Sequence, residues 1–328
     1  HLSNGSLWPI PITLDVTEDF AKKIKHKEKI TLRDKEGFAL AILKISDIWI
    51  PDLNKEALAV YGTKSIVHPA VNYLLNFSNK VYVGGELEGI SFPRHYDYQL
   101  YRHTPQELRN IFINKKWEKI VAFQTRNPLH KAHVEMTMRA TEDLNAKLLI
   151  HPAVGLTKPG DVDHYTRVRC YEHVLKKYPS NAAMLSLLPL AMRMGGPREL
   201  LWHALIRKNY GCTHIVAGRD HAGPGNDENG NSFYGPYDAQ ELLLNYESEI
   251  GIKMVPFKFM VYIPSENKYK ANDEVKKGTE VKTLSGTELR QLLDKGKGIP
   301  EWFSYKEVAY ELEKSRPPLT KRGLTIFF

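Results

Sequence analysis

The sequence predicts an α/β protein with a mostly parallel central sheet, and three observations lead to this fold class. From about residue 99 onward, short apolar runs alternate with longer amphipathic segments, which is the pattern of repeated strand–helix units. The amphipathic segments end at helix-stop signals, with Gly211 after residues 197–210 and Gly251 after residues 237–250. Repeated strand–helix units need right-handed crossovers, and such crossovers join parallel strands.

The alternation can be assigned element by element. The first expected strand is the apolar run 120–123, and a proline begins the helix expected at 197–210. The full set comprises strands at 120–123, 147–151, 183–188, 214–217 and 253–263, and helices at 163–178, 197–210 and 237–250. Ligands of such sheets bind beyond the carboxyl ends of the strands, so the loops after 120–123 and 214–217 are candidate binding loops.

Smaller regions flank this central part, which we place at residues 99–264. Residues 1–98 carry strand-like patches at 7–14, 40–50 and 80–85, and predict a small β-rich domain. Residues 265–322 predict a small, mainly helical domain. A capping box of Ser285 with Glu288 and a staple of Leu284 with Leu289 mark a helix start there, and we assign this stretch no catalytic role.

The last residues, 323–328, form an apolar, β-prone segment after a basic linker that contains proline. A finished domain rarely ends on such a strand, because a free strand edge promotes aggregation. We therefore expect residues 323–328 to be the first strand of a further nucleotide-binding domain. The alternative is a tail that packs on the catalytic domain.

Composition narrows the class of protein. The 328 residues carry a net charge of +8 and have a sequence pI near 9.1, but lysine and arginine are scattered rather than clustered. A positive excess fits nucleic acid or small polyanions, but this distribution favours a mostly solvated surface with a few arginines at an anion site. No apolar run is long enough to cross a membrane, and residues 2–11 lack the features of a signal peptide. Cys170 and Cys212 lack a disulfide spacing, so we expect reduced thiols and a cytoplasmic protein.

The most informative stretch is Gln-Thr-Arg-Asn-Pro-Leu-His-Lys-Ala-His, residues 124–133, directly after the apolar run 120–123. Asn127 and Pro128 predict a helix start, with His130 and His133 on one face of its first turns. A helix N-terminus offers unpaired N–H groups and a partial positive charge, and Arg126 adds a permanent cation. The stretch therefore predicts a polyanion site.

Two simpler interpretations of the histidines are less well supported by the sequence. His130 and His133 alone would be read as ordinary helix residues, but the full ten-residue string after a strand argues against that. A metal site of His130, His133 and Glu135 lacks the His-Glu-x-x-His order and a further ligand at motif spacing. We therefore expect no protein-held metal.

A second loop, Gly-Arg-Asp-His-Ala-Gly-Pro-Gly at residues 218–225, follows the strand expected at 214–217. Its small residues let backbone N–H groups approach an anion, and Arg219 can bind phosphate. Residues 154–161 are expected to line the site. In residues 192–199, Arg193 or Arg198 either contributes to phosphate binding, or Arg198 and Glu199 are first-turn surface residues.

Other nucleotide-binding motifs are absent from the sequence. There is no Gly-x-x-x-x-Gly-Lys-Ser/Thr string and no Gly-x-Gly-x-x-Gly after the first catalytic strand, which argues against a P-loop and against a dinucleotide oxidoreductase. Residues 227–231 lack the spacing of a calcium loop.

The strings at 124–133 and 218–225, with 154–161, 192–199 and 284–290, resemble the signatures of the ATP sulfurylases (sulfate adenylyltransferases). The resemblance covers nearly the whole chain. It implies a Rossmann-like nucleotidyltransferase domain, preceded by a PUA-like domain and followed by the small helical domain. A segment that precedes residue 2 in the family is absent, so we expect the first domain to be incomplete. Some members are fused to an adenylyl-sulfate kinase or kinase-like domain, which would follow residue 322.

The resemblance also implies site residues. Gln124, Thr125, Arg126 and Asn127 would contact ATP, with Gln124 and Arg126 also holding sulfate. Thr125, Arg126 and Asn127 would be catalytic with His130 and His133, the two histidines stabilising the transition state. The other expected ligands are Gly218, Arg219, Asp220, His221 and Met260 for ATP, and the backbone of Ala222 for sulfate.

The implied chemistry matches these residue types. Sulfate is already ionised, so neither a general base nor an activated nucleophile is needed, and catalysis depends on positioning and charge neutralisation. The expected partners are ATP, sulfate, adenylyl sulfate and pyrophosphate, with Mg²⁺ accompanying ATP and held largely by phosphates and water. A homo-oligomer and a fused or separate adenylyl-sulfate kinase are also expected, without nucleic acid or membrane.

Two other functions stay open at this stage. The chain could be a nucleotidyltransferase for another anion, such as selenate. It could instead be a basic RNA-binding protein, which would need surface aromatics interleaved with basic stripes. Salt-sensitive RNA binding would separate this second function from the enzyme.

Overall fold

The computed structural model describes residues 1–158, 160–321 and 323. The strand expected at 323–328 lies outside the described residues except for its first residue. Contacts within the chain group the residues into two compact units. The first unit holds His1–Leu100, Arg193–Trp202 and Asp220–Leu242. The second unit holds Tyr101–Met192, His203–Arg219 and the described part of Leu243–Phe328. The predicted boundaries at residues 98 and 264 stay predictions.

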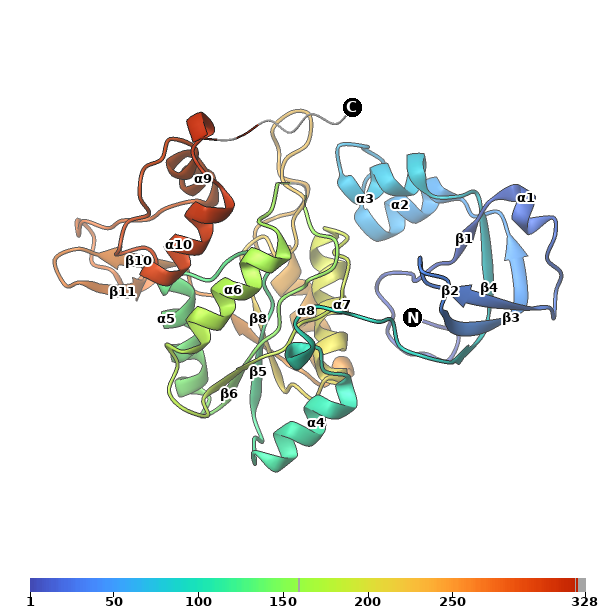
Figure 1. Ribbon diagram of the computed structural model, residues 1–328, viewed down its shortest axis with the longest axis horizontal. Coiled ribbons are helices and arrows are strands. Elements are labelled where there is room, and N and C mark those ends of the chain that lie inside the picture. The colour runs from blue at the N-terminus through green and yellow to red at the C-terminus, as the bar shows by residue number, and fades with distance from the viewer. Residues whose placement is uncertain (159, 322, 324–328) are drawn as a thin grey trace. The chain divides into compact units, whose positions relative to one another are not determined.

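The first unit contains an antiparallel four-stranded sheet in the order β1-β4-β3-β2 (Figure 1). Buried Leu43, Ile45 and Val83 form the core on one of its faces. A second core lies around α2 and includes Ala57 and Val71. The elements are β1 Asp15–Val16, α1 Glu18–Ala21, β2 Lys29–Arg33, β3 Ala39–Trp49, α2 Leu53–Tyr61, α3 Pro69–Asn72 and β4 Val81–Gly89.

The predictions for the first unit hold for two strands and fail for one. The patches expected at 40–50 and 80–85 correspond to β3 and β4. The patch at 7–14 is not a strand, and only Asp15–Val16 pair as β1. Pro9 and Pro11 explain the difference, because proline lacks the N–H that a strand donates to its neighbour.

The second unit is built on a five-stranded, fully parallel sheet in the order β7-β6-β5-β8-β9, which confirms the predicted α/β fold class. The strands are β5 Ile120–Phe123, β6 Lys147–Ile150, β7 Ala183–Leu185, β8 His214–Ala217 and β9 Lys253–Pro256. All four residues of the central strand β5 are buried. Because β5 and β8 are parallel neighbours, the loops that follow them begin at the same edge of the sheet.

Four helices connect these strands as expected, with small shifts of their ends: α5 Lys131–Asp143, α6 His164–Leu175, α7 Gly196–Asn209 and α8 Asp238–Ile250. A further helix, α4 Pro105–Asn114, precedes β5 and was not predicted. Helices α7 and α8 are followed by Gly211 and Gly251, whose positive φ angles of 94° and 72° suit glycine after a helix end. The capping residue of α6 is Asp163, whose side chain accepts the N–H of Thr166 at 2.9 Å.

The helix after β5 begins later than the sequence predicts. It starts at Lys131 with His130 as its capping residue, instead of at Pro128 with Asn127. The reason is local, because the Asn127 N–H is bound by the Thr125 hydroxyl at 3.0 Å and the chain turns there. His130 therefore stands at the boundary of the helix, and only His133 lies within its first turn.

The strand expected at 253–263 is divided between two sheets. Residues Lys253–Pro256 form β9 of the parallel sheet, and Met260–Ile263 form β10, which pairs antiparallel with β11 Lys268–Ala271. Met260 therefore belongs to a hairpin and not to the last strand of the main sheet. The hairpin packs against α5.

The C-terminal region combines that hairpin with two helices, α9 Gly286–Asp294 and α10 Lys306–Ser315. Figure 1 shows them as the orange and red end of the chain. The capping box of Ser285 with Glu288 is present as predicted. Helix α10 packs against α6, and this contact joins the region to the parallel-sheet part of the second unit.

Candidate active site

The loop after β5 is closed by the Thr125 hydroxyl. Its Oγ1 accepts the N–H of Asn127 and donates to the Asn127 carbonyl, both at 3.0 Å. The Tyr171 hydroxyl donates to the same carbonyl at 2.9 Å. Thr125 is buried and Asn127 is exposed. The Thr125 side chain therefore shapes the loop, while the Asn127 side chain lies at the surface.

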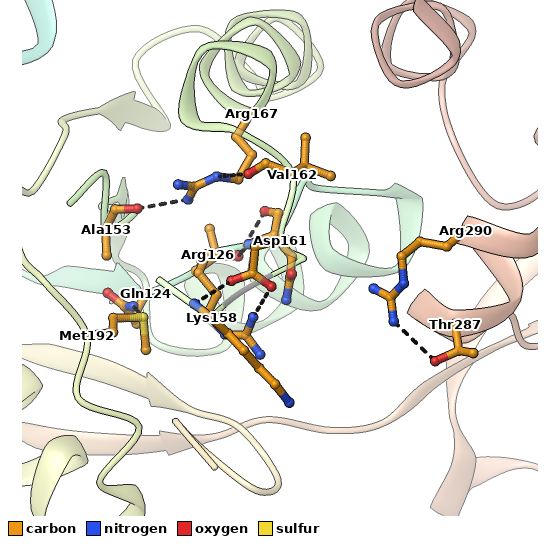
Figure 2. A network of polar contacts seen from close by, with 12 residues as sticks. Gln124, Arg126, Ala153, Lys158, Asp161, Val162, Arg167, Met192, Thr287 and Arg290 are labelled. Carbon is orange, nitrogen blue, oxygen red and sulfur yellow. Dashed lines mark hydrogen bonds and ion pairs between the residues drawn. The ribbon is translucent and has the colours of Figure 1, made fainter. Parts of the chain in front are cut away.

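Arg126 is paired with a carboxylate that the sequence analysis gave no role. One oxygen of Asp161 accepts from its guanidinium, and the other accepts the Lys158 N–H at 3.1 Å (Figure 2). The Arg126 and Asp161 side chains are only 22% and 10% exposed. Screening by water is therefore weak, and this ion pair is stronger than a surface salt bridge. An incoming anion has to compete with Asp161 for Arg126.

The segment that carries Asp161 is anchored at both ends by a buried arginine. Arg167, on α6, donates from Nε to the Val162 carbonyl at 2.9 Å and from Nη1 to the Ala153 carbonyl at 2.8 Å (Figure 2). Gly155 lies where the backbone of Leu190 approaches closely, because an added Cβ would sit 2.5 Å from the Leu190 carbonyl oxygen. The residues on either side of the predicted site-lining loop are thus held firmly by the fold.

Gln124 is the first residue after β5, and its side chain is buried. Its amide nitrogen donates to the Met192 sulfur at 3.6 Å, and its carbonyl oxygen accepts from Arg207 of α7 (Figure 2 shows Gln124 beside Met192). Gln124 therefore enters the site with a defined orientation.

The two histidines at the start of α5 are held by different partners. The His130 N–H donates to Nδ1 of His133 at 3.1 Å, so a neutral His133 carries its proton on Nε2. His130 Nδ1 lies 3.0 Å from the Ser304 hydroxyl, and its ring lies 4.2 Å from that of Phe303. Residues 303–304, far away in sequence, thus help to orient the first histidine.

Both histidines are neutral at physiological pH. Burial lowers the pKa of His133 to about 4. Burial, followed by the charge of His133, lowers the pKa of His130 well below its ordinary value. Protonating His133 on Nδ1 would also break its hydrogen bond with the His130 N–H. These rings can therefore donate hydrogen bonds to an anion, but they do not add positive charge.

The loop after β8 begins with Gly218 and Arg219, which belong to the second unit. Arg219 is exposed, and the structure gives it no ion pair among the residues that it describes. Arg219 is therefore a cation at the carboxyl edge of the sheet, and it can bind phosphate without first breaking an ion pair with a carboxylate.

The same loop continues in the first unit with Asp220, His221 and Ala222. Asp220 and Ala222 have left-handed backbones, with φ angles of 49° and 54°. This region is strained for residues other than glycine and is often found at functional sites. The Ala222 carbonyl accepts the Gly196 N–H at 3.2 Å, whereas the Ala222 N–H has no partner within the described ranges.

A cavity of about 630 Å³ lies in the second unit, next to the start of α5. It is lined by Asn127, His130, His133 and Met260, four of the predicted site residues. Asp161 also borders it, so the cavity reaches the partner of Arg126. The small C-terminal region contributes Lys282, Ser285, Arg290, Trp302 and Phe303, among others. The volume is suitable for a nucleotide-sized ligand.

In the described part of the chain, none of the helices is long and apolar enough to cross a membrane. The same part contains no group of three or more His, Cys, Asp or Glu side chains that could hold a metal ion.

Two family models together match most of the chain. A family model described as ATP-sulfurylase matches residues 99–315, and a model described as PUA-like domain matches residues 1–92. The chain belongs to the ATP-sulfurylase family. The PUA-like match also confirms the architecture expected for the first region.

The relatives include proteins named Sulfate adenylyltransferase from three fungi. Identity is 54% with that of Mycosarcoma maydis, over 100% of this chain and 58% of that protein. Identity is 52% with the protein of Schizosaccharomyces pombe, over 99% of this chain and 67% of that protein. Identity is 53% with the protein of Saccharomyces cerevisiae, over 99% of this chain and 64% of that protein. The chain thus spans roughly three fifths of the length of these relatives.

A solved structure described as "Hexameric APS kinase from Thiobacillus denitrificans" is similar in fold. It is 30% identical, covers 97% of this chain and 55% of that chain, and has a TM-score of 0.76.

The structure brings several predicted site residues together within the second unit. Residues 124–127, His130 and His133 lie along one loop and helix start. Met260 lines the same cavity as Asn127, His130 and His133. Gly218 and Arg219 follow the neighbouring strand β8. Asp220, His221 and Ala222 belong to the first unit. The ligand assigned to each of these residues remains a prediction.

Sequence reasoning missed some contacts and misjudged one residue. Asp161 lies in the stretch expected to line the site, but its ion pair with Arg126 has no local sequence signal. Ser304 and Arg207 carry no motif at all. Glu199, considered as a surface residue, is fully buried and accepts the N–H groups of Arg193 and Gly195. Arg198 donates to the Pro9 carbonyl at 3.1 Å, which is a structural contact.

Proposed function

We propose that the chain carries a sulfate adenylyltransferase site, which joins ATP and sulfate to give adenylyl sulfate and pyrophosphate. The observation that carries the proposal is the loop between β5 and α5. It combines a largely buried arginine, two neutral histidines and a helix N-terminus next to a nucleotide-sized cavity. Family membership and the names of the fungal relatives support the same reaction.

The reaction needs positioning rather than an activated nucleophile. A sulfate oxygen forms a bond with the α-phosphorus of ATP, while the bond from that phosphorus to the bridging oxygen breaks and its electron pair leaves with pyrophosphate. Sulfate is already ionised, so no proton has to be removed. The barrier comes from bringing two anions together, and donors placed in advance around the reacting groups lower it.

The residues contact two substrates, and some contact both. Gln124 and Arg126 would hold sulfate and would also contact ATP. Ala222 would offer its backbone N–H to sulfate. The other ATP contacts would be Thr125, whose side chain also shapes the loop, with Asn127, Gly218, Arg219, Asp220, His221 and Met260. His130, His133 and the N-terminus of α5 would stabilise the negative charge that builds up on the phosphate oxygens in the transition state.

ATP would enter as its magnesium complex. With no cluster of three metal-ligating side chains in the described part of the chain, Mg²⁺ would be held by phosphates and water. The ion would neutralise charge on the triphosphate. Removing it with a chelator should abolish turnover, and adding it back should restore activity.

The proposed function can be tested by sulfate-dependent exchange of labelled pyrophosphate into ATP. We expect exchange that requires both sulfate and Mg²⁺, and formation of ATP from adenylyl sulfate and pyrophosphate. Exchange that proceeds equally without sulfate would contradict the proposal. Selenate in place of sulfate measures how strictly the oxyanion is selected. An exposed control variant such as Lys27→Ala should leave the exchange unchanged.

We also propose a homo-oligomer, a cytoplasmic location and an adenylyl-sulfate kinase that consumes the product, either fused or separate. Buried free thiols at Cys170 and Cys212 suit a reducing compartment. Light scattering on the purified chain tests the oligomer. Removing residues 323–328 tests whether they belong to a further domain or to the catalytic domain. Exchange activity should persist if they belong to a further domain.

A further inference from the structure

The Gln124 side chain is oriented by a buried cation behind it. Arg207, near the end of α7, is fully buried, and its Nη2 donates to the Gln124 side-chain oxygen. The same nitrogen donates to the His151 carbonyl at 2.9 Å, just beyond β6. All three residues belong to the second unit, and Arg207 thus links α7 to the ends of the two neighbouring strands β5 and β6.

This contact determines which end of the amide faces Arg207. A guanidinium has only donors, so its partner on Gln124 must be the carbonyl oxygen. If the amide were reversed, its N–H groups would face the N–H groups of Arg207 in a buried environment. Neither side would then have an acceptor, and each unsatisfied donor would destabilise the folded protein. The amide nitrogen of Gln124 is therefore directed away from Arg207.

The amide nitrogen retains the capacity to donate. Its contact in the structure is the Met192 sulfur at 3.6 Å, and a thioether is a weak acceptor. The nitrogen carries two hydrogens, and an oxyanion is a far better acceptor than a thioether. The Gln124 side chain is thus held firmly at its oxygen and weakly at its nitrogen. An anion can therefore replace the Met192 sulfur as the acceptor of the amide N–H.

We propose that Arg207 is a positioning residue for sulfate, which acts by holding the Gln124 carbonyl so that its amide nitrogen donates to the oxyanion. The inference deepens the proposed function and rests on it. Arg207 touches neither substrate in this proposal, and its effect passes through Gln124.

The first test separates an effect through Gln124 from a general structural effect. Arg207→Lys keeps the charge but loses the planar fork. We expect it to raise the KM for sulfate about fivefold or more and to change the KM for ATP less than twofold. In the Gln124→Ala background, the same change should add less than about twofold, because residues acting as one unit are not additive. Equal losses in both backgrounds would overturn the proposal.

A second variant leaves Arg207 intact, so its result does not depend on whether the fold tolerates a substitution of Arg207. Gln124→Glu retains an acceptor for Arg207 but replaces the amide donor with an oxygen. We expect it to raise the KM for sulfate more than Gln124→Ala does. If Gln124→Glu binds sulfate as well as the wild type, the amide nitrogen does not face the anion and the proposal fails.

Arg109 supplies a matched control. It donates from Nε to the Asn209 carbonyl at 2.7 Å, at the end of the same helix α7, and this contact does not involve Gln124. Arg109→Lys perturbs an arginine contact of α7 and should leave both KM values unchanged. A rise in the KM for sulfate as large as that of Arg207→Lys would show a general effect of α7 and contradict the proposal.

A spectroscopic readout keeps this inference separate from the proposed function. In protein labelled with ¹⁵N-glutamine, the Gln124 side-chain signal is identified by its loss in Gln124→Ala. We expect Arg207→Lys to shift it towards the position of a free glutamine, and inorganic sulfate to shift it in the wild type only. A signal unmoved by Arg207→Lys overturns the positioning role. A signal that responds as expected, in a protein without sulfate-dependent exchange, rejects the proposed function alone.

Discussion

The loops after β5 and β8 begin at adjacent strand ends but are held in different ways. Residues 124–130 are held through side chains, by the Thr125 hydroxyl, the ion pair of Arg126 with Asp161 and the bond from Arg207 to Gln124. In residues 218–225, the positive φ angles of Asp220, Ala222 and Gly225 set the course of the backbone instead.

The difference predicts what each loop presents to a ligand. A loop held through its side chains presents charges and donors in defined directions. A loop held by an unusual backbone presents N–H groups, as Ala222 does, and Gly223 leaves room for the Asp220 carboxylate, which an added Cβ would approach to 1.9 Å. Substitutions in the first loop should therefore alter turnover strongly, and those in the second should alter anion affinity moderately.

The largest effect is expected at Arg126. Arg126→Ala removes the main cation of the first loop and should lower the exchange rate at least about a hundredfold, or roughly 2.7 kcal/mol. It also leaves the mostly buried Asp161 carboxylate without its cation, which should lower the free energy of unfolding by roughly 1–3 kcal/mol. Exchange assays and urea unfolding measure the two effects.

Two variants separate charge from geometry at this position. Arg126→Lys should lose about tenfold in rate because it cannot engage two oxygens at once. The double variant Arg126→Ala with Asp161→Ala should recover most of the stability without recovering the rate. A double variant that regains exchange would show that Asp161, and not the missing cation, limits the single variant.

His133 is expected to give the next largest effect. His133→Ala should lower kcat roughly thirtyfold and change the KM for ATP by less than about threefold, because its donor matters mainly in the transition state. His133→Gln should retain part of the rate, since glutamine at this helix position can accept the His130 N–H and still donate. Initial-rate kinetics test both variants, and a glutamine variant as poor as the alanine variant would argue against this role.

The sequence predicted those parts of the molecule that depend on local patterns. Both ends of strand β5 were predicted correctly, because its four consecutive apolar side chains are all buried. The start of α5 was misplaced because the Thr125 hydroxyl takes the Asn127 N–H, a competition that propensities do not reveal. The break before Met260 was missed because β9 and β10 share one strand-like run of residues.

Contacts between distant residues could not be predicted from the pattern. Arg126 and Asp161 are 35 residues apart, and Gln124 and Arg207 are 83 apart. The sequence therefore indicated which residues carry the chemistry, but not which neighbours orient them. Those neighbours are a carboxylate and an arginine, residue types that are common on any surface and carry no motif.

The stability of the chain should fall in mild acid, and His133 should account for part of the loss. Its folded pKa of about 4 lies below the ordinary value of 6.5, so the unfolded chain binds the proton more readily. The contribution is complete above pH 6.5 and is lost as the pH falls towards 4. Between pH 7 and pH 5 we expect about 1–2 kcal/mol from this residue.

The measurement compares urea unfolding of the wild type and His133→Gln at the two pH values. The variant should lose less stability between pH 7 and pH 5, by about the amount given above. Because Ala222 does not titrate, Ala222→Gly should show the pH dependence of the wild type. An identical pH dependence in His133→Gln would mean that this histidine titrates normally in the folded protein.

The smallest effect is expected in the backbone of the second loop. Ala222 has a φ angle of 54°, which costs about 1 kcal/mol for a residue with a Cβ and nothing for glycine. Ala222→Gly relieves that cost but makes the unfolded chain more flexible, so stability should change by less than about 1 kcal/mol. The N–H group is then held less rigidly, and the KM for sulfate should rise about threefold.

Lys27→Gly is the matched control, because Lys27 is exposed in the first unit with a φ angle of 68°. It should show a similar small change in stability and no change in KM. If Ala222→Gly leaves the KM for sulfate unaltered, the strained backbone serves only the turn, and the contrast between the two loops does not extend to anion binding.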